Sequence, residues 1–142
     1  MRLIDTNLLV YAYQALAPER ERAAAWLQSV LDGNERVGLP WTTLLGFVRL
    51  MTHPRIVSRP LKSQAAWDIV DTLLDQPNVW IPAPGDEHRQ ILRRLFANNM
   101  TSKLAPDAHL AALALEHGLI LCSADSDFAR FSELRWENPL AY

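Results

Sequence analysis

Four aspartates lie where the chain passes from an apolar run to a polar segment, which is where strands and helices begin and end. They are Asp5, Asp107, Asp125 and Asp127. Carboxylates held near one another repel unless protons or a cation neutralise them, and a set of oxygen ligands suits Mg²⁺ or Mn²⁺ better than zinc. These four residues are therefore candidate metal ligands.

Each aspartate also has a purely structural interpretation. Asp5 with Asn7 could end a strand in a turn, Asp107 could favour the start of a helix, and the segment DSD could cap a short helix. Because Asp and Asn often serve turns and caps, each residue taken alone is better explained in this way. Only their joint placement at one edge of the fold would indicate a metal site.

The hydrophobic pattern predicts the elements that would position these side chains. Short apolar runs typical of strands alternate with longer segments of helical spacing, and this alternation indicates an α/β fold with a mostly parallel sheet. The runs are RLID, RVGLP, NVWIP, LILCSA and LRWEN. Ligands bind at the carboxyl ends of the strands in an open parallel sheet, and Asp5, Asp125 and Asp127 would all lie at that edge.

Two segments have the clearest helical signatures. SQAAWDIVDTLLDQP carries an apolar stripe and is expected to be purely structural. APDAHLAALALEHG has Pro106 suited to its first turn and Gly118 to its end, with apolar or small residues throughout 110–115. The second helix is therefore expected to be buried nearly all round, and Asp107 in its first turn could reach the edge that carries the other acids.

Length and composition indicate one globular domain spanning residues 1–142, because 49% of the residues are hydrophobic and 21% are charged. No apolar run reaches the roughly 18 residues that a membrane span needs, and the N-terminal stretch does not have the form of a signal peptide. We therefore expect a cytoplasmic protein with no membrane association. The net charge of −2 neither indicates nor excludes a nucleic-acid partner.

The cysteine and the histidines favour neither nucleophilic nor zinc chemistry. Cys122 is the single cysteine, and its place in the apolar run LILC predicts a buried structural thiol. The four histidines show no spacing typical of a catalytic triad or a zinc site. His109 and His117 are accordingly expected to be incidental helix residues.

Three segments together resemble the PIN domain, specifically the VapC-type toxins of toxin–antitoxin pairs. They are LIDTNLLVYAY, LAPDAHLAALALEHGLILCSADSDFARF and LRWENPL, and they span essentially the whole chain. The most specific parts are D-T-N after the first strand, D-A-x-L-A-A-L-A at the start of a helix and the turn S-x-D-x-D-F. The resemblance implies a three-layer α/β/α sandwich with a mostly parallel central sheet.

The same resemblance implies an endoribonuclease that hydrolyses RNA phosphodiester bonds with Mg²⁺ or Mn²⁺ as cofactor. The residues that it identifies as catalytic and metal-binding are Asp5, Asp107 and Asp125, with Asp127 as a further metal ligand. Asn7 and Ser123 match polar family positions that support these carboxylates by hydrogen bonds. The implied partners are an RNA substrate and a cognate antitoxin that keeps the enzyme inactive, in a homodimer or a toxin–antitoxin hetero-oligomer.

One segment departs from the family pattern. Many members carry a glutamate in the helix after the second strand, whereas this chain has Gly46 there and no acidic residue within 41–55. Helical spacing groups four residues on one face of that helix, which are Thr42, Gly46, Arg49 and His53. We expect this face to look into the site, with Thr42 or water in the vacated coordination position, because Mg²⁺ commonly keeps several waters.

The surfaces that would meet partners are less clearly defined by the sequence. Residues 44–51 are apolar on more than one side of the predicted helix, so this helix is either sandwiched inside the domain or exposed to a partner. The basic residues that could contact RNA are scattered and identify no substrate-binding surface. They are Arg49, Arg55, Arg59, Lys62, Arg89, Arg93, Arg94, Lys103 and Arg130.

Two other functions remain open at this point. One is a PIN fold kept for binding RNA or a partner, with its chemistry weakened by Gly46. The other is a phosphatase of the haloacid-dehalogenase kind, which also begins from an aspartate after the first strand. That class normally has a second aspartate two residues later, where this chain has Asn7, and it needs a catalytic lysine that the SADSDF region does not offer.

Overall fold

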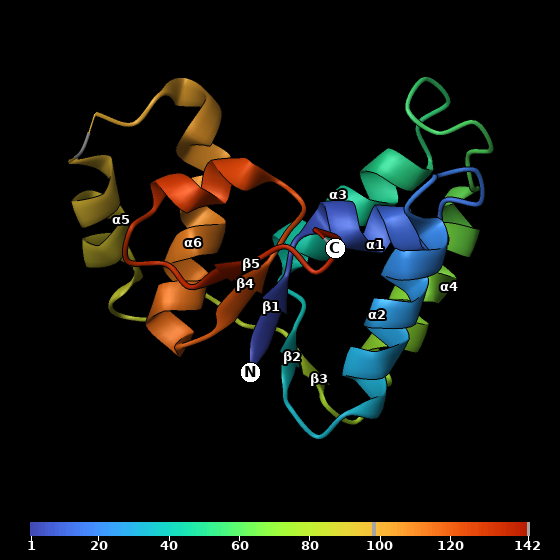
Figure 1. Cartoon of the computed structure of the whole chain (residues 1–142), viewed down its shortest axis with the longest axis horizontal. Coiled ribbons are helices and arrows are strands. Elements are labelled where there is room, and N and C mark those ends of the chain that lie inside the picture. The colour runs from blue at the N-terminus through green and yellow to red at the C-terminus, as the bar shows by residue number, and fades with distance from the viewer. Residues whose placement is uncertain (98, 142) are drawn as a thin grey trace.

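The centre of the fold is a parallel β-sheet, seen in a computed structural model that describes residues 1–97 and 99–141 (Figure 1). Within these residues the strand order is β3-β2-β1-β4-β5, and every pairing is parallel. The strands are β1 (Arg2–Ile4), β2 (Val37–Gly38), β3 (Val79–Trp80), β4 (Ile120–Cys122) and β5 (Trp136–Glu137). Each of the five apolar runs predicted to be a strand contains one of them.

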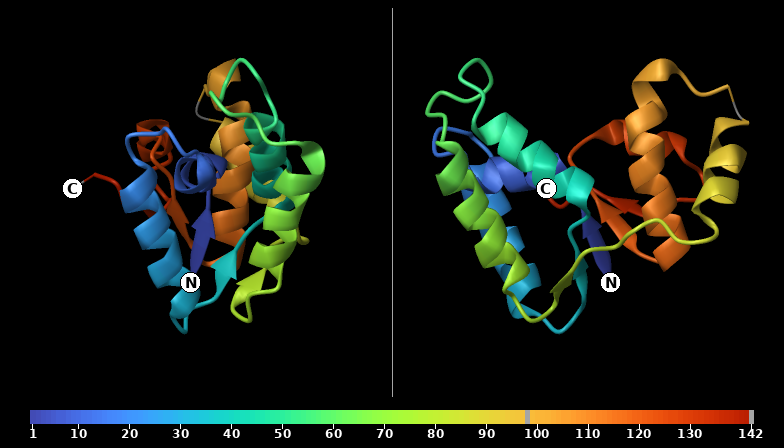
Figure 2. Two further views of the ribbon diagram at one scale, coloured as in Figure 1. Left: turned by 90° about the vertical axis from the view of Figure 1, so that its right-hand side faces the viewer. Right: turned by 180° about the vertical axis from the view of Figure 1, so that it is seen from behind.

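Helices cover both faces of this sheet (Figures 1 and 2). On one face lie α1 (Thr6–Tyr13), α2 (Arg20–Asp32), α3 (Trp41–Met51) and α4 (Ser63–Leu74). On the other lie α5 (His88–Phe96) and α6 (Ala105–His117). The short 3₁₀ helices are η1 (Ser102–Leu104) and η2 (Ser126–Arg130). The predicted three-layer α/β/α sandwich is therefore confirmed.

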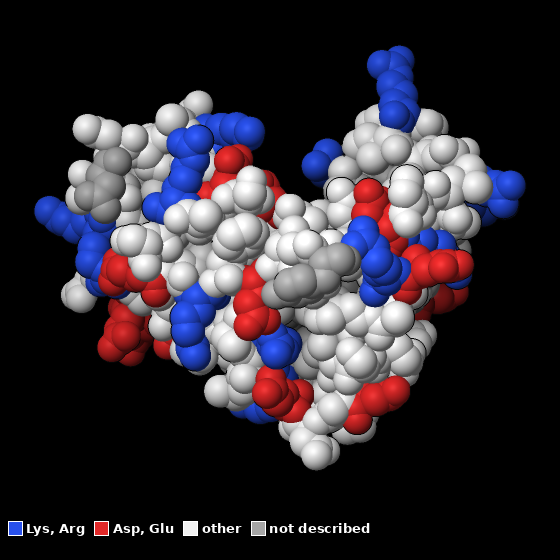
Figure 3. Space-filling view, in the orientation of Figure 1, with Lys and Arg blue, Asp and Glu red and all other residues white. Residues whose placement is uncertain are grey.

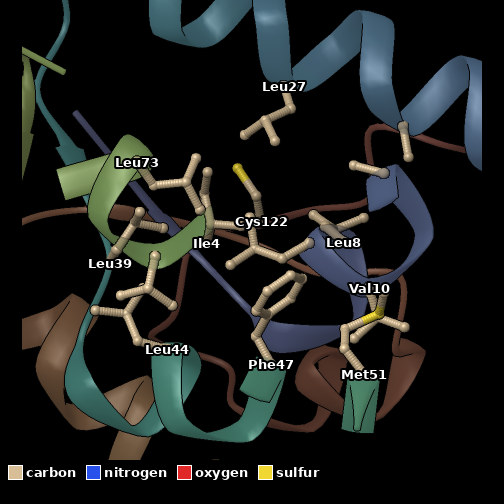
Figure 4. Packing of buried hydrophobic residues seen from close by; sticks show 14 of the residues in the cluster. Ile4, Leu8, Val10, Leu27, Leu39, Leu44, Phe47, Met51, Leu73 and Cys122 are labelled. Atoms are coloured by element: carbon tan, nitrogen blue, oxygen red, sulfur yellow. The ribbon is translucent and has the colours of Figure 1, made fainter. Parts of the chain in front are cut away.

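Alternation along the strands supplies both cores. Successive side chains of a strand point to opposite faces, so Ile4 and Cys122 enter the core beneath α1 to α4. Leu3 and Leu121 enter the core beneath α5 and α6. Figure 4 shows Ile4 and Cys122 packed near Phe47 in the first core. Burial raises the pKa of the Cys122 thiol to about 11, which agrees with the predicted structural role.

The two clearest helical signatures correspond to α4 and α6. On α4, three residues of the predicted stripe are buried: Ala66, Val70 and Leu73. Pro106 lies in the first turn of α6, and Gly118 ends the helix with a φ of 66°, a left-handed conformation that glycine adopts readily. Residues 110–114 of α6 are buried, as predicted. None of the helices formed by the described residues is long and apolar enough to cross a membrane.

Helix α3 buries one side and exposes another. Leu44, Phe47 and Met51 lie in the core, whereas Leu45 is 56% exposed and Trp41 is 45% exposed. The ring of Trp41 stacks on that of Trp67 from α4, with the ring planes 3° apart and the centroids separated by 6.3 Å. The helix is therefore not sandwiched inside the domain.

Candidate metal centre

The candidate site lies at the carboxyl ends of β1 and β4, which are neighbours in the sheet. Asp5 follows β1 and caps α1, and Asp125 follows β4 and caps η2. Asp107 approaches from the first turn of α6. One carboxylate oxygen from each of Asp107, Asp125 and Asp127 lies within 4.8 Å of the other two. The fold thus gathers three of the four predicted ligands at one point.

Asp5 reaches this point from the central strand. It lines a pocket of about 160 Å³ together with Asp107. Its Oδ1 accepts a hydrogen bond from the backbone N–H of Thr6 at 2.8 Å, and its Oδ2 accepts one from Ser123 Oγ at 2.7 Å. Each carboxylate oxygen offers two lone pairs, so both oxygens keep the capacity to bind a cation.

Ser123 connects the carboxylates and is fully buried. Besides donating to Asp5, its hydroxyl accepts hydrogen bonds from Asn7 Nδ2 at 3.1 Å and from the backbone N–H of Asp125 at 3.0 Å. Asn7 Oδ1 accepts from the backbone N–H of Ala124 at 3.2 Å. Asn7 and Ser123 therefore hold Asp5 against the turn that carries Asp125.

Burial and neighbouring negative charge raise the pKa of two carboxyl groups of the site, Asp5 and Asp107. Burial is the main cause of the raised pKa of Asp5, and the charge of Asp125 adds to it, while the hydrogen bonds from Ser123 and Thr6 oppose it. Burial also raises the pKa of Asp107 to about 6, with contributions from the charges of the neighbouring aspartates. A proton or a divalent cation would relieve this repulsion.

Asp127 faces cations as well as acids. The Nζ of Lys103, from η1, lies 3.4 Å from Asp127 Oδ2. The Nε of Arg130, from the end of η2, lies 3.9 Å from Asp127 Oδ1. Lys103 also opposes the rise in the pKa of Asp107. Asp127 is thus the member of the cluster that is already paired with positive charge.

Comparison with known proteins agrees with this arrangement, since a sequence profile of the PIN domain matches residues 2–134. The chain belongs to the PIN-domain family. Ribonuclease VapC37 of Mycobacterium tuberculosis is 40% identical to it over 142 residues, which cover 99% of each chain. Ribonuclease VapC43 of the same organism is 39% identical over 141 residues, covering 99% of this chain and 96% of the relative. The predicted resemblance to VapC-type PIN proteins is confirmed.

Solved structures show the same PIN fold at low sequence identity. FitAB bound to an IR36 DNA fragment matches with a TM-score of 0.69 and 18% identity, over 100% of this chain and 97% of that one. VapBC2 from Rickettsia felis, bound to a DNA fragment from its promoter, matches with a TM-score of 0.68 and 16% identity, over 96% and 97% of the two chains. At such identities the likeness concerns the fold alone.

Thr42 borders the candidate site. It is exposed and lines the pocket that Asp5 and Asp107 also line. Two other residues of the same predicted face lie further along α3 and after it. Arg49 is exposed, and His53 Nδ1 accepts a hydrogen bond from the backbone N–H of Arg55 at 3.1 Å. The first turn of α3 is therefore the part of this face that borders the pocket.

Gly46 packs against Thr6 of α1, and Thr6 lines the same pocket as Asp5 and Asp107. That the Gly46 face looks into the site therefore stays a prediction. A Cβ atom at Gly46 would lie 2.7 Å from Thr6 Oγ1, closer than real side chains approach. That hydroxyl is held in place, because it donates a hydrogen bond to the backbone oxygen of Thr43 at 3.1 Å. Glycine at this position allows α3 to approach the first turn of α1 closely.

Thr43 is a positioning residue that the sequence reasoning missed. It is buried, and its hydroxyl donates to the backbone oxygen of Ile4 at 2.8 Å. Together with the bond from Thr6, this hydrogen bond ties the start of α3 to the end of β1. The signal was present in the two adjacent threonines at a helix start, because threonine hydroxyls there often bond to backbone groups.

We expect Gly46→Glu to lower the free energy of unfolding by about 1–3 kcal/mol, the usual cost of overpacking, and to leave Mn²⁺ affinity unimproved. Gly46→Ala is the matched control, because it introduces the same Cβ contact with Thr6 without a carboxylate. Urea denaturation and isothermal titration with Mn²⁺ measure the two effects. Tighter Mn²⁺ binding by the glutamate variant than by the alanine variant would show that this position does face the metal.

Without metal, we expect the protein to become less stable as the pH rises from about 4 to about 6. Asp107 has a pKa of about 6 in the folded state against an ordinary value of 3.8, so the folded state binds this proton more tightly. The resulting stabilisation is complete below the lower pKa and is lost as the pH rises through the higher one. Asp107→Asn removes this dependence, so at pH 7 in EDTA the variant should melt at a higher temperature than the wild type. Superimposable pH profiles of the two proteins would show that the pKa of Asp107 is not raised in the folded state.

Proposed function

We propose that this chain is a metal-dependent endoribonuclease that acts as the toxin of a toxin–antitoxin pair. The observation that carries the proposal is the cluster of three carboxylates within 4.8 Å, joined to Asp5 through Ser123, at the carboxyl edge of a PIN fold. Relatives at about 40% identity over nearly their full length are ribonucleases by name, which supports RNA as the substrate.

The proposed cofactor is Mg²⁺ or Mn²⁺. The donors are all carboxylate oxygens, and burial together with the charges of the neighbouring aspartates raises the pKa of Asp107, so the site fits a hard divalent cation. We assign the catalytic role to Asp5, Asp107 and Asp125, and cation binding to these three with Asp127. When bound, the cation would lower the pKa of a water and screen charge on the leaving oxygen.

The other side chains of the site would position these acids. Ser123 holds Asp5 by its donated hydrogen bond, and Asn7 orients Ser123. Thr42 borders the pocket and could supply an oxygen, or contact a bound water, where α3 offers no carboxylate. Water completes such a coordination shell readily, because Mg²⁺ needs only one or two carboxylates.

The proposed partner is a cognate antitoxin in the cytoplasm, in a complex that could also contain a toxin homodimer. The fold neighbours support this proposal, since they are described as FitAB and VapBC assemblies. The exposed apolar side of α3, with Trp41 and Leu45, offers a surface for such association.

Cleavage of RNA by the purified chain, with Mg²⁺ or Mn²⁺ and then with EDTA, tests the proposal. We expect internal cleavage only with metal, and no hydrolysis of p-nitrophenyl phosphate, a general phosphatase substrate. RNA binding without cleavage under any metal would favour the weakened PIN fold, and hydrolysis of the phosphatase substrate alone would favour the dehalogenase-like alternative. Expression of the chain alone should arrest growth, and the cognate antitoxin should relieve the arrest.

A further inference from the structure

The acidic site carries two basic side chains on its border, Lys103 and Arg130. Both reach Asp127, at 3.4 Å and 3.9 Å. Lys103 lies in η1, four residues before Asp107, and Arg130 ends η2, five residues after Asp125. Arg130 therefore lies in the same short helix as Asp127, and Lys103 lies in the short helix that leads into α6, which carries Asp107.

We propose that Lys103 and Arg130 bind the phosphate backbone of the RNA beside the bond that is cleaved. The inference rests on the proposed function and names the substrate-binding residues of that same site. Neither side chain is assigned to the chemical step; both are positioning residues that attract and orient an anionic strand.

The charges at the site create the need for such residues. Four carboxylates carry a formal charge of −4, and one divalent cation leaves −2, which still repels a phosphodiester. Lys103 and Arg130 together bring the formal charge of the site to zero. Interactions of lysine and arginine with phosphate supply a large share of the affinity of proteins for nucleic acid. These two side chains would therefore offset the remaining negative charge at the site and attract the phosphates of the RNA.

Their exposure leaves both groups available to a ligand. The side chain of Lys103 is 81% exposed and that of Arg130 is 65% exposed. An ammonium has three donors and a guanidinium has five, so pairing with Asp127 leaves several of them unused. The planar guanidinium also matches a phosphate with two parallel hydrogen bonds. Figure 3 shows basic atoms beside acidic atoms on the wall of the hollow at the top of the molecule.

Structural stabilisation does not account for these ion pairs. Exposed pairs of this kind contribute little to folding because solvent screens them and long side chains lose entropy. The pairing also has a cost for metal binding, since positive charge beside the cluster repels a cation. The presence of Lys103 and Arg130 beside the acids is explained if these side chains bind a negatively charged ligand.

The test measures binding of a fluorescently labelled single-stranded RNA by anisotropy, in Ca²⁺ and over a range of salt concentrations. For Lys103→Ala and for Arg130→Ala we expect affinity to fall about 10-fold or more, and the slope of log K against log salt to decrease in magnitude by about 0.7 for each phosphate that the variant no longer neutralises. Mn²⁺ affinity, measured by isothermal titration, should be unchanged or tighter. In a cleavage assay KM should rise while kcat changes little.

Arg135→Ala is the matched control, because it also removes one exposed arginine. Arg135 precedes β5 at the opposite edge of the sheet, where its Nη2 donates to the backbone oxygen of Gly118 at 3.2 Å. This variant should keep the wild-type RNA affinity and salt slope. Arg130→Lys, which keeps the charge, should keep the slope as well.

An unchanged RNA affinity and salt slope in the double alanine variant would overturn the inference, whether or not the wild type cleaves RNA. Equal decreases in the Arg135→Ala control would also overturn it, because the effect would then reflect net charge. Absence of cleavage by a wild type whose RNA binding depends on Lys103 and Arg130 would instead contradict the proposed nuclease activity. The two failures are therefore distinguishable.

Discussion

Asp107→Asn is expected to lower the rate of metal-dependent RNA cleavage at least about 100-fold and to abolish the stabilisation of the protein by Mn²⁺. Loss of a group that only supports a metal ligand costs about 10- to 100-fold, so loss of a ligand should cost at least as much. An oxygen of Asp107 lies within 4.8 Å of oxygens from Asp125 and Asp127, and its carboxylate is the one that α6 contributes.

The stabilisation provides a readout that does not depend on activity. A ligand that binds only the native state adds RT ln(1 + [L]/Kd) to the free energy of unfolding, so millimolar Mn²⁺ should raise the melting temperature of the wild type. Asp75→Asn is the control, because it removes an exposed carboxylate from the end of α4. A rise with Mn²⁺ that persists in Asp107→Asn would place the metal elsewhere.

Ser123→Ala is expected to weaken Mn²⁺ binding about 10- to 100-fold and to lower the free energy of unfolding by about 1–3 kcal/mol. The substitution removes the donor to Asp5 and the acceptor for Asn7 and for the backbone of Asp125. Ser123 is fully buried, so water does not readily replace its hydroxyl. Asp5 would lose the hydrogen bond that orients its Oδ2, and the missing hydrogen bonds would cost stability.

Ser126→Ala serves as the control for this variant. Ser126 begins η2, three residues after Ser123, and is exposed. Its replacement should change neither the melting temperature nor the Mn²⁺ affinity measurably. If Ser123→Ala binds Mn²⁺ as tightly as the wild type, then Asp5 does not depend on this hydrogen bond for its position.

Much of the fold could be predicted because its signals are local. An apolar run is the requirement for a strand buried between two layers of helices, and each predicted run contains a strand of the sheet. Pro106 and Gly118 bound α6 because each residue has a backbone preference that suits its end of a helix. Asp5 follows β1 directly and Asp125 comes three residues after the end of β4, so a parallel sheet was enough to place them at one edge.

The contacts that complete the site were decided by the tertiary structure. Helical spacing grouped Thr42 with Gly46, yet only the packing of α3 on α1 placed Thr6 against Gly46. The pairing of Lys103 with Asp127 likewise joins side chains from two segments that lie more than twenty residues apart, whereas Arg130 pairs with Asp127 within η2. A sequence pattern indicates which residues share a face of one element, whereas the neighbour of that face depends on how the elements pack. By itself, the sequence therefore determined the sheet, its carboxyl edge and the acids there, while tertiary packing decided which side chains hold those acids and which cations border them.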